Sequence, residues 1–132
     1  MIAEIGVNHE GSMDCAKMLI EQAHAGGADA AKFQSYRADT LASKNSPAYW
    51  DTDKEPTTNQ HQLFSKHDSF GEAQYRELAD HCRTTGIDFL STPFDDVYVD
   101  FLAPMMPFFK IASADITNTP LLRRVASKGK AV

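Results

Sequence analysis

Two lysines, Lys32 and Lys110, stand inside short apolar stretches whose composition is typical of buried β-strands. Moving an ammonium group out of water costs several kcal/mol unless an anion or a hydrogen-bond network receives it, so each lysine requires a partner. The stretches that contain them are residues 30–35 and 108–112. The same form, a short apolar run with a polar group near its C-terminal end, recurs at residues 2–6 and 87–93.

The two lysines would present cations at the ends of their strands, with the hydroxyl groups of Thr92 and Ser113 beside them and Glu4 as the nearby anion. Such a group suits a phosphate or carboxylate ligand held by charge-assisted hydrogen bonds, and in a dry pocket it would also stabilise charge that develops during a reaction. The alternative is that one or both lysines extend to solvent at the strand ends. Spacing alone leaves both interpretations open.

Two further polar residues follow the same strands. Gln34 comes two residues after Lys32 and would face the same side of the sheet, because side chains alternate along a strand. Asp115 lies in the loop two residues after Ser113, where it could orient Lys110 or accept a hydrogen bond from a sugar hydroxyl.

The elements that position these residues alternate between strand and helix. Helices are predicted to begin where a capping residue or a proline precedes apolar residues at helical spacing, near Ser12, Ser69, Asp95 and Thr119. They end close to glycine, the residue that best tolerates the left-handed conformation after a helix. Strand and helix alternate with no hairpin signal, which predicts a parallel sheet. Residues 131–132 are predicted to begin a fifth strand.

Two α/β architectures fit this alternation. A doubly wound sheet fits the length of 132 residues, but its usual G-x-G-x-x-G turn after the first strand is absent. A (β/α)8 barrel needs about 250 residues, about twice this length. Polar residues at the C-terminal ends of strands favour the barrel, where such residues form the active site. We therefore predict one partial domain, residues 1–132, that forms the N-terminal half of a (β/α)8 barrel with about four βα units.

Residues 36–68 form an unusually long connection, since most connections in a compact domain have about 4–6 residues. Because this segment contains apolar side chains such as Trp50 and Phe64, we predict an ordered lid or substrate loop. Asn8, His9 and Glu10 could form a catalytic loop or an ordinary strand-to-helix turn whose polar side chains face water, and we predict the turn.

Composition excludes several classes of protein. The net charge is −5, with no clustered basic surface of the kind that binds nucleic acid. No apolar run approaches the ~18 residues that cross a bilayer, and the first residues do not resemble a signal peptide. We therefore predict a cytoplasmic protein that binds neither nucleic acid nor membranes. Cys15 and Cys82 are predicted to be reduced packing thiols.

Five motifs, taken in order, are more specific than these patterns. They are IAEIGVNHEG at residues 2–11, AKFQ at 31–34, FSKH at 64–67, LSTPFD at 90–95 and FKIASAD at 109–115. In this order they closely resemble the N-terminal half of the sialic acid synthase family. Members of that family are transferases that condense phosphoenolpyruvate with an N-acetylated hexose, such as N-acetylmannosamine, to make nonulosonic acids.

The resemblance implies roles for particular residues. Phosphoenolpyruvate would be contacted by Lys32, Lys110, Thr92 and Ser113, while Glu4 and Gln34 would lie towards the sugar and the reacting centre. A divalent cation, Mn2+ or Mg2+, would polarise the sugar aldehyde. C3 of phosphoenolpyruvate would attack that aldehyde, water would add at C2, and phosphate would leave with C–O cleavage. The family's metal-binding histidines belong to the second half of the barrel, so no metal ligand is assigned in this chain.

The resemblance also implies a homodimer in which a small antifreeze-like C-terminal domain, absent from this sequence, covers the partner's active site. A half-barrel exposes two strand edges that can pair with another chain. We therefore expect the isolated chain to be inactive, and either to associate through those edges or to be a piece of a longer protein. Two other functions stay open: synthesis of another 3-deoxy sugar acid from phosphoenolpyruvate, and a non-catalytic half-barrel that binds phosphorylated metabolites.

Overall fold

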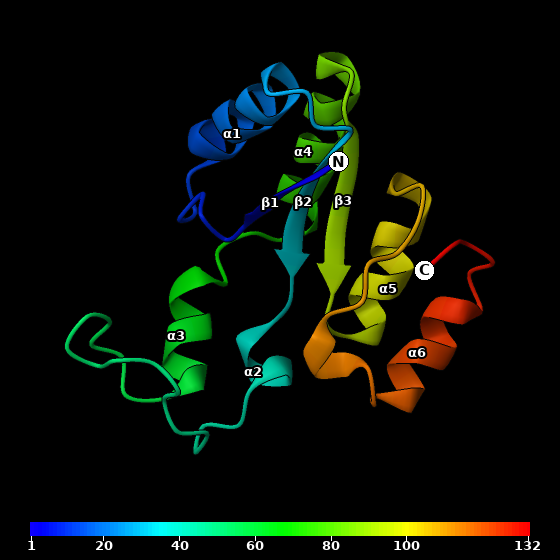
Figure 1. Cartoon of the computed structure of the whole chain (residues 1–132). Helices are drawn as coiled ribbons and strands as arrows, with labels where there is room; N and C mark the ends of the chain where they lie inside the picture. The colour runs from blue at the N-terminus through cyan, green and yellow to red at the C-terminus, as the bar shows by residue number, and fades with distance from the viewer.

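A computed structural model describes residues 1–132 and contains one parallel sheet of three strands. The strands are β1 (Ile2–Gly6), β2 (Ala30–Ser35) and β3 (Asp88–Pro93), and β2 lies in the middle. All three run in the same direction, so their C-terminal ends lie at the same end of the sheet (Figure 1). The predicted parallel α/β arrangement is therefore confirmed.

The strands are joined by helices that pack on the sheet. Helix α1 (Met13–Ala25) connects β1 to β2, and helix α4 (Glu72–Thr85) lies between β2 and β3. These two helices contact each other, α1 also contacts β1 and β2, and α4 contacts β3. After β3 the chain forms α5 (Asp96–Leu102) and α6 (Thr119–Ala126), which contact one another beside β3 (Figure 1).

Local capping explains where these helices begin. Ser12 Oγ accepts a hydrogen bond from the Cys15 N–H at 3.2 Å, and Asp95 Oδ1 accepts one from the Tyr98 N–H at 2.9 Å. Each bond satisfies a backbone donor that has no partner inside the first turn. One predicted start is displaced, because α4 is capped at Gly71 instead of Ser69, whereas α6 begins at Thr119 as predicted, with Asn118 as its cap.

The long segment after β2 is ordered, as predicted. It contains two short helices, α2 (Ala38–Leu41) and α3 (Gln60–His67). The rings of Tyr36 and Phe64 meet edge to face at 5.6 Å. The Trp50 indole N–H donates to the backbone carbonyls of Glu55 and Thr57. These aromatic contacts hold residues 36–68 together and against the end of β2. The role of this segment as a lid stays a prediction.

The two faces of the sheet differ in chemistry. Phe33 and Phe89 belong to a continuous apolar core that includes residues of α1 and α4, and their rings lie 5.9 Å apart. Alternation along β2 places Lys32 and Gln34 on the opposite face. In the register of the sheet, Lys32 pairs with Glu4 on one side and Leu90 on the other.

The predicted fourth and fifth strands do not form, so these two predictions are wrong. Residues 108–112 lie between the 3-10 turns Ala103–Met105 and Ser113–Asp115 and make no ladder with β3. The Ser91 N–H on that edge of β3 donates instead to Met106 Sδ at 3.0 Å. The Phe109 N–H donates to the Ala131 carbonyl at 2.9 Å, a single bond in place of a strand pairing.

Candidate active site

The centre of the candidate site is an ion pair between adjacent strands. Glu4 and Lys32 are register partners on β1 and β2, and the Lys32 ammonium contacts the Glu4 carboxylate. The Lys32 side chain is only 6% exposed, whereas the Glu4 side chain is 54% exposed. Lys32 therefore has the anionic partner that its burial requires, and that partner is free to move into solvent.

Gln34 lies close to the same carboxylate. At Gly6 the backbone adopts a left-handed φ of +58°, and a Cβ added there would lie 3.4 Å from Glu4 Oε1 and 3.7 Å from Gln34 Nε2. The absence of a side chain at Gly6 leaves room for both polar groups. Glu4, Lys32 and Gln34 thus form one cluster at the C-terminal edge of the sheet, and we call it the Lys32 cluster.

Thr92 adds an unpaired hydroxyl to this edge. It is the register partner of Gln34, it is 2% exposed, and its Oγ1 has no hydrogen-bond partner. Leaving a buried hydroxyl without a partner costs about 1–3 kcal/mol, so a ligand that formed a hydrogen bond with it would recover that energy. The arrangement offers a cation, an amide and a hydroxyl to an anionic molecule, which is the chemistry of a carboxylate or phosphate site.

The second half of the predicted site is arranged differently. Lys110 and Ser113 are exposed and lie outside the sheet, so the prediction of a buried strand lysine is wrong at Lys110. No ion pair or hydrogen bond joins either residue to the Lys32 cluster. Asp115 Oδ1 accepts a hydrogen bond from Asn118 Nδ2 at 3.1 Å within its own loop. The ligand-binding roles of these three residues stay predictions.

His9 is a buried residue in this region, and the prediction that it faces water is wrong. It is 2% exposed, and its ring stacks on Phe70 with centroids 4.1 Å apart. His9 Nδ1 accepts a hydrogen bond from the Gly11 N–H at 3.1 Å. Burial, and secondarily the charge of His67, lower the pKa of His9. The neutral ring therefore fixes the turn after β1 against the start of α4.

This lowered pKa predicts a loss of stability in acid. Well above pH 6.5, the ordinary pKa of histidine, His9 is neutral in both folded and unfolded chains and contributes no pH dependence. As the pH falls below that value, His9 binds a proton more readily in the unfolded chain than in the folded chain, where its pKa is lowered. The free energy of unfolding should then decrease by at most about 1.4 kcal/mol per pH unit through His9. Urea denaturation between pH 7.5 and 5 measures this slope.

The His9→Asn variant separates His9 from the other titrating groups. Its side-chain oxygen can replace Nδ1 as the acceptor but does not titrate, so its pH slope should be shallower than that of the parent chain. His24→Asn is the matched control, because His24 is exposed on α1. Equal slopes in the parent and His9→Asn chains would contradict the account of His9.

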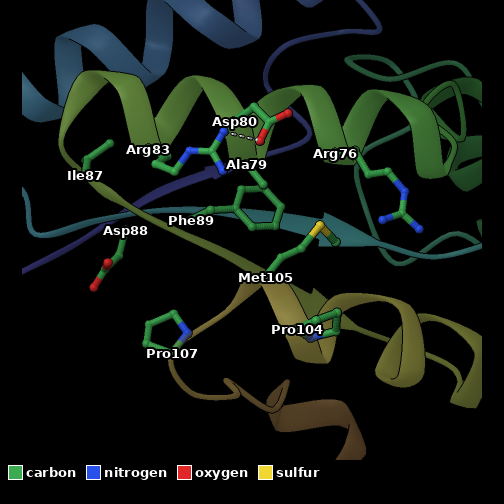
Figure 2. Close-up of a pocket in the computed structure, with 10 residues that line it drawn as sticks. All are labelled: Arg76, Ala79, Asp80, Arg83, Ile87, Asp88, Phe89, Pro104, Met105 and Pro107. Atoms are coloured by element: carbon green, nitrogen blue, oxygen red, sulfur yellow. Dashed lines mark ion pairs between the residues drawn. The ribbon is translucent and has the colours of Figure 1, made fainter.

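A separate hollow lies at the other end of the sheet. Figure 2 shows the residues that line it, which lie between α4 and residues 104–107, beside Asp88 and Phe89 at the start of β3. The volume of this pocket is about 480 Å³. Its Arg83 is paired with Asp80 at 2.9 Å. In barrels with parallel strands the chemistry occurs at the C-terminal ends, and the opposite face serves stability. This pocket is therefore not the candidate active site.

The described side chains do not fit a metal ion. No group of three or more His, Cys, Asp or Glu residues comes together in a way that could hold one. The divalent cation implied by resemblance therefore has no ligand set among these residues. None of the helices has the length and apolar character needed to span a membrane.

The fold and this cluster define the class of protein. Adjacent parallel strands with polar residues at their C-terminal ends match the N-terminal part of a (β/α)8 barrel enzyme. The family model described as "NeuB family" matches residues 19–132. The chain therefore belongs to the NeuB family, and the resemblance to sialic acid synthases is confirmed.

Relatives within this family are named as synthases. The chain is 38% identical to the N,N'-diacetyllegionaminic acid synthase of Legionella pneumophila over 97% of its length and 36% of that protein's. It is 37% identical to human N-acetylneuraminate-9-phosphate synthase, with 98% and 36% of the two chains covered. The chain thus spans about 36% of the length of these relatives.

A solved structure supports the fold. The N-acetylneuraminic acid synthetase of Leptospira borgpetersenii, crystallised in complex with citrate, superimposes with a TM-score of 0.82 at 32% identity. The match covers 98% of this chain and 41% of that protein. The predicted fold, the N-terminal part of a (β/α)8 barrel, is therefore confirmed, although the fourth strand does not form in this chain.

Proposed function

We propose that this chain supplies the phosphoenolpyruvate-binding part of a nonulosonic acid synthase that uses an N-acetylated hexose as its second substrate. The observation that carries the proposal is Lys32, a buried ammonium whose only anionic partner is the half-exposed Glu4. A ligand anion can take the place of Glu4 on Lys32 at little cost, because the displaced carboxylate regains water. NeuB-family membership agrees with this assignment.

Each residue of the site then has a distinct task. Lys32 binds an anionic oxygen of phosphoenolpyruvate, and the Thr92 hydroxyl and the Gln34 amide donate hydrogen bonds that orient it. The same fixed donors stabilise negative charge as the phosphate leaves with C–O cleavage. Glu4, released from Lys32, accepts a hydrogen bond from a hydroxyl group of the sugar. C3 of the oriented phosphoenolpyruvate attacks the sugar aldehyde, and water adds at C2.

Lys110 and Ser113 complete the proposed site when the ligand is bound. Both side chains are exposed, and no ion pair holds Lys110, so a second anionic group of the ligand can recruit it. We also propose that residues 1–132 form one partial barrel domain that acts within a homo-oligomer in the cytoplasm. The whole reaction belongs to a complete synthase, and ligand binding is the part that this chain can perform alone.

Calorimetric titration of the chain with phosphoenolpyruvate tests the proposal. We expect measurable binding, stronger than that of pyruvate or inorganic phosphate, because only phosphoenolpyruvate carries both anionic groups. Lys110→Ala should weaken binding about tenfold, the effect of one charged hydrogen bond of about 1.4 kcal/mol. No binding of phosphoenolpyruvate would contradict the proposed function, whereas equal affinities of the parent and Lys110→Ala would contradict only the role of Lys110.

A further inference from the structure

A second pocket opens at the same end of the sheet as the Lys32 cluster. Its volume is about 470 Å³, and it is formed by the turn after β1 and by the long segment after β2. It is lined by Val7, Asn8, Glu10, Glu55, Lys66 and His67. Lys66 and His67 belong to the FSKH motif, to which the phosphoenolpyruvate site gives no role. We call this hollow the Lys66 pocket.

The Lys66 pocket adjoins the Lys32 cluster along the chain. Val7 directly follows Gly6, the residue against which the side chains of Glu4 and Gln34 lie. We infer that a molecule in the pocket would lie beside one that is bound at Lys32. This is the relation that two substrates need if a bond is to form between them.

The charges of the Lys66 pocket are mixed, and its cation is already neutralised. Lys66 Nζ lies 2.8 Å from Glu55 Oε2, and the Thr57 N–H donates to Glu55 Oε1 at 3.3 Å. These contacts, with the Lys66 bond the largest, lower the pKa of Glu55, so its carboxylate is ionised. Glu10 adds a second carboxylate, exposed and without an ion pair. Two carboxylates thus face one ammonium group, and the imidazole of His67 is the remaining ionisable side chain of the lining.

This arrangement favours a neutral molecule with many hydroxyl groups. Each hydroxyl can donate to a carboxylate of Glu10 or Glu55 and accept from the Asn8 amide or the Lys66 ammonium. A phosphate group has acceptor oxygens and a negative charge of its own. It would either face Glu10 or have to separate Lys66 from Glu55, and placing like charges side by side is strongly unfavourable.

Family membership does not decide between the two kinds of sugar. The relatives include synthases named for a phosphorylated product, N-acetylneuraminate 9-phosphate, and synthases named for N,N'-diacetyllegionaminic acid. We propose that the Lys66 pocket binds the sugar substrate and selects its unphosphorylated form through the carboxylates of Glu10 and Glu55. This inference rests on the proposed function and names the substrate class of its second site.

Chemical-shift titration of the 15N-labelled chain with N-acetylmannosamine and with its 6-phosphate tests the inference. We expect the neutral sugar to shift the amide signals of Asn8, Glu10 and Lys66, and to bind at least about tenfold more tightly than the phosphate. Equal or tighter binding of the 6-phosphate would overturn the proposal. So would the absence of shifts at these amides with either sugar.

Glu55→Gln provides a second, directional test. The substitution keeps the size of the side chain but releases Lys66, so affinity for the 6-phosphate should rise about tenfold relative to the neutral sugar. Glu77→Gln is the matched control, because Glu77 forms a similar pair with Lys17 at 2.5 Å between α4 and α1. An unchanged preference in Glu55→Gln would overturn the proposal. Phosphoenolpyruvate binding is measured separately. If phosphoenolpyruvate binds but the sugar preference is unchanged, only the inference about the Lys66 pocket fails; if phosphoenolpyruvate does not bind, the proposed function fails.

Discussion

A Lys32→Met variant is expected to bind phosphoenolpyruvate at least about a hundredfold more weakly than the parent chain, a loss of about 2.7 kcal/mol. The reason is that Lys32 is the buried cation at the C-terminal edge of the sheet, and a ligand anion placed there without it would be left uncompensated. The hydroxyl of Thr92 and the amide of Gln34 are neutral and cannot replace that charge. Calorimetric titration of both chains measures the difference.

The same substitution should leave the fold intact. Methionine fills the space of the lysine stem, and Glu4 is half-exposed, so its carboxylate is hydrated once the ammonium is gone. Replacing a buried ion pair by an apolar side chain is often neutral or stabilising. We therefore expect the free energy of unfolding to fall by no more than about 1 kcal/mol, or to rise. If the Lys32→Met chain were unfolded in the absence of ligand, Lys32 would have a structural role instead of a ligand-binding one.

Lys17→Met serves as the control for the loss of a positive charge. Lys17 is also paired with a glutamate, but it joins α1 to α4 on the outer surface, away from the strand ends. Its removal should leave both phosphoenolpyruvate binding and stability nearly unchanged, since exposed ion pairs contribute about 0–1 kcal/mol. If Lys17→Met weakened binding as much as Lys32→Met, general charge rather than a specific contact would explain the effect.

The sequence predicts best those features that depend on nearby residues. Ser12 and Asp95 cap the helices that follow them, because a capping side chain needs only the backbone two or three residues ahead. The three strands of the sheet are predicted by short apolar runs that end before turns. Lys32 is recognised as a site residue because a lysine in such a run requires an anion, and the parallel register supplies Glu4.

Features that depend on distant partners are not predictable in this way. Residues 108–112 have the composition of a buried strand, but a strand exists only when a neighbour completes its ladder, and Met106 occupies the donor on the edge of β3. The burial of His9 depends on Phe70, which is far away in the sequence. The unpaired hydroxyl of Thr92 likewise results from packing, and no local pattern indicates it.

The largest effect on stability is expected at Phe33, the neighbour of Lys32 on the other face of β2. Phe33 is fully buried, and its ring stacks on Phe89 at 5.9 Å in the centre of the core. Phe33→Ala should lower the free energy of unfolding by about 3–5 kcal/mol, through lost transfer energy and the cavity left behind. Domains of this kind are stable by about 5–15 kcal/mol, so a measurable fraction of the variant should be unfolded.

Urea denaturation followed by circular dichroism measures this loss, with Tyr49→Ala as the control. Tyr49 is 74% exposed, so its removal should change stability by no more than about 0.5 kcal/mol. The two variants then separate the two roles of β2. Phe33→Ala should reduce stability while its folded fraction still binds phosphoenolpyruvate. Lys32→Met should weaken phosphoenolpyruvate binding while its stability is kept. A Phe33→Ala chain as stable as the parent would mean that the two faces of β2 are not divided between core and site.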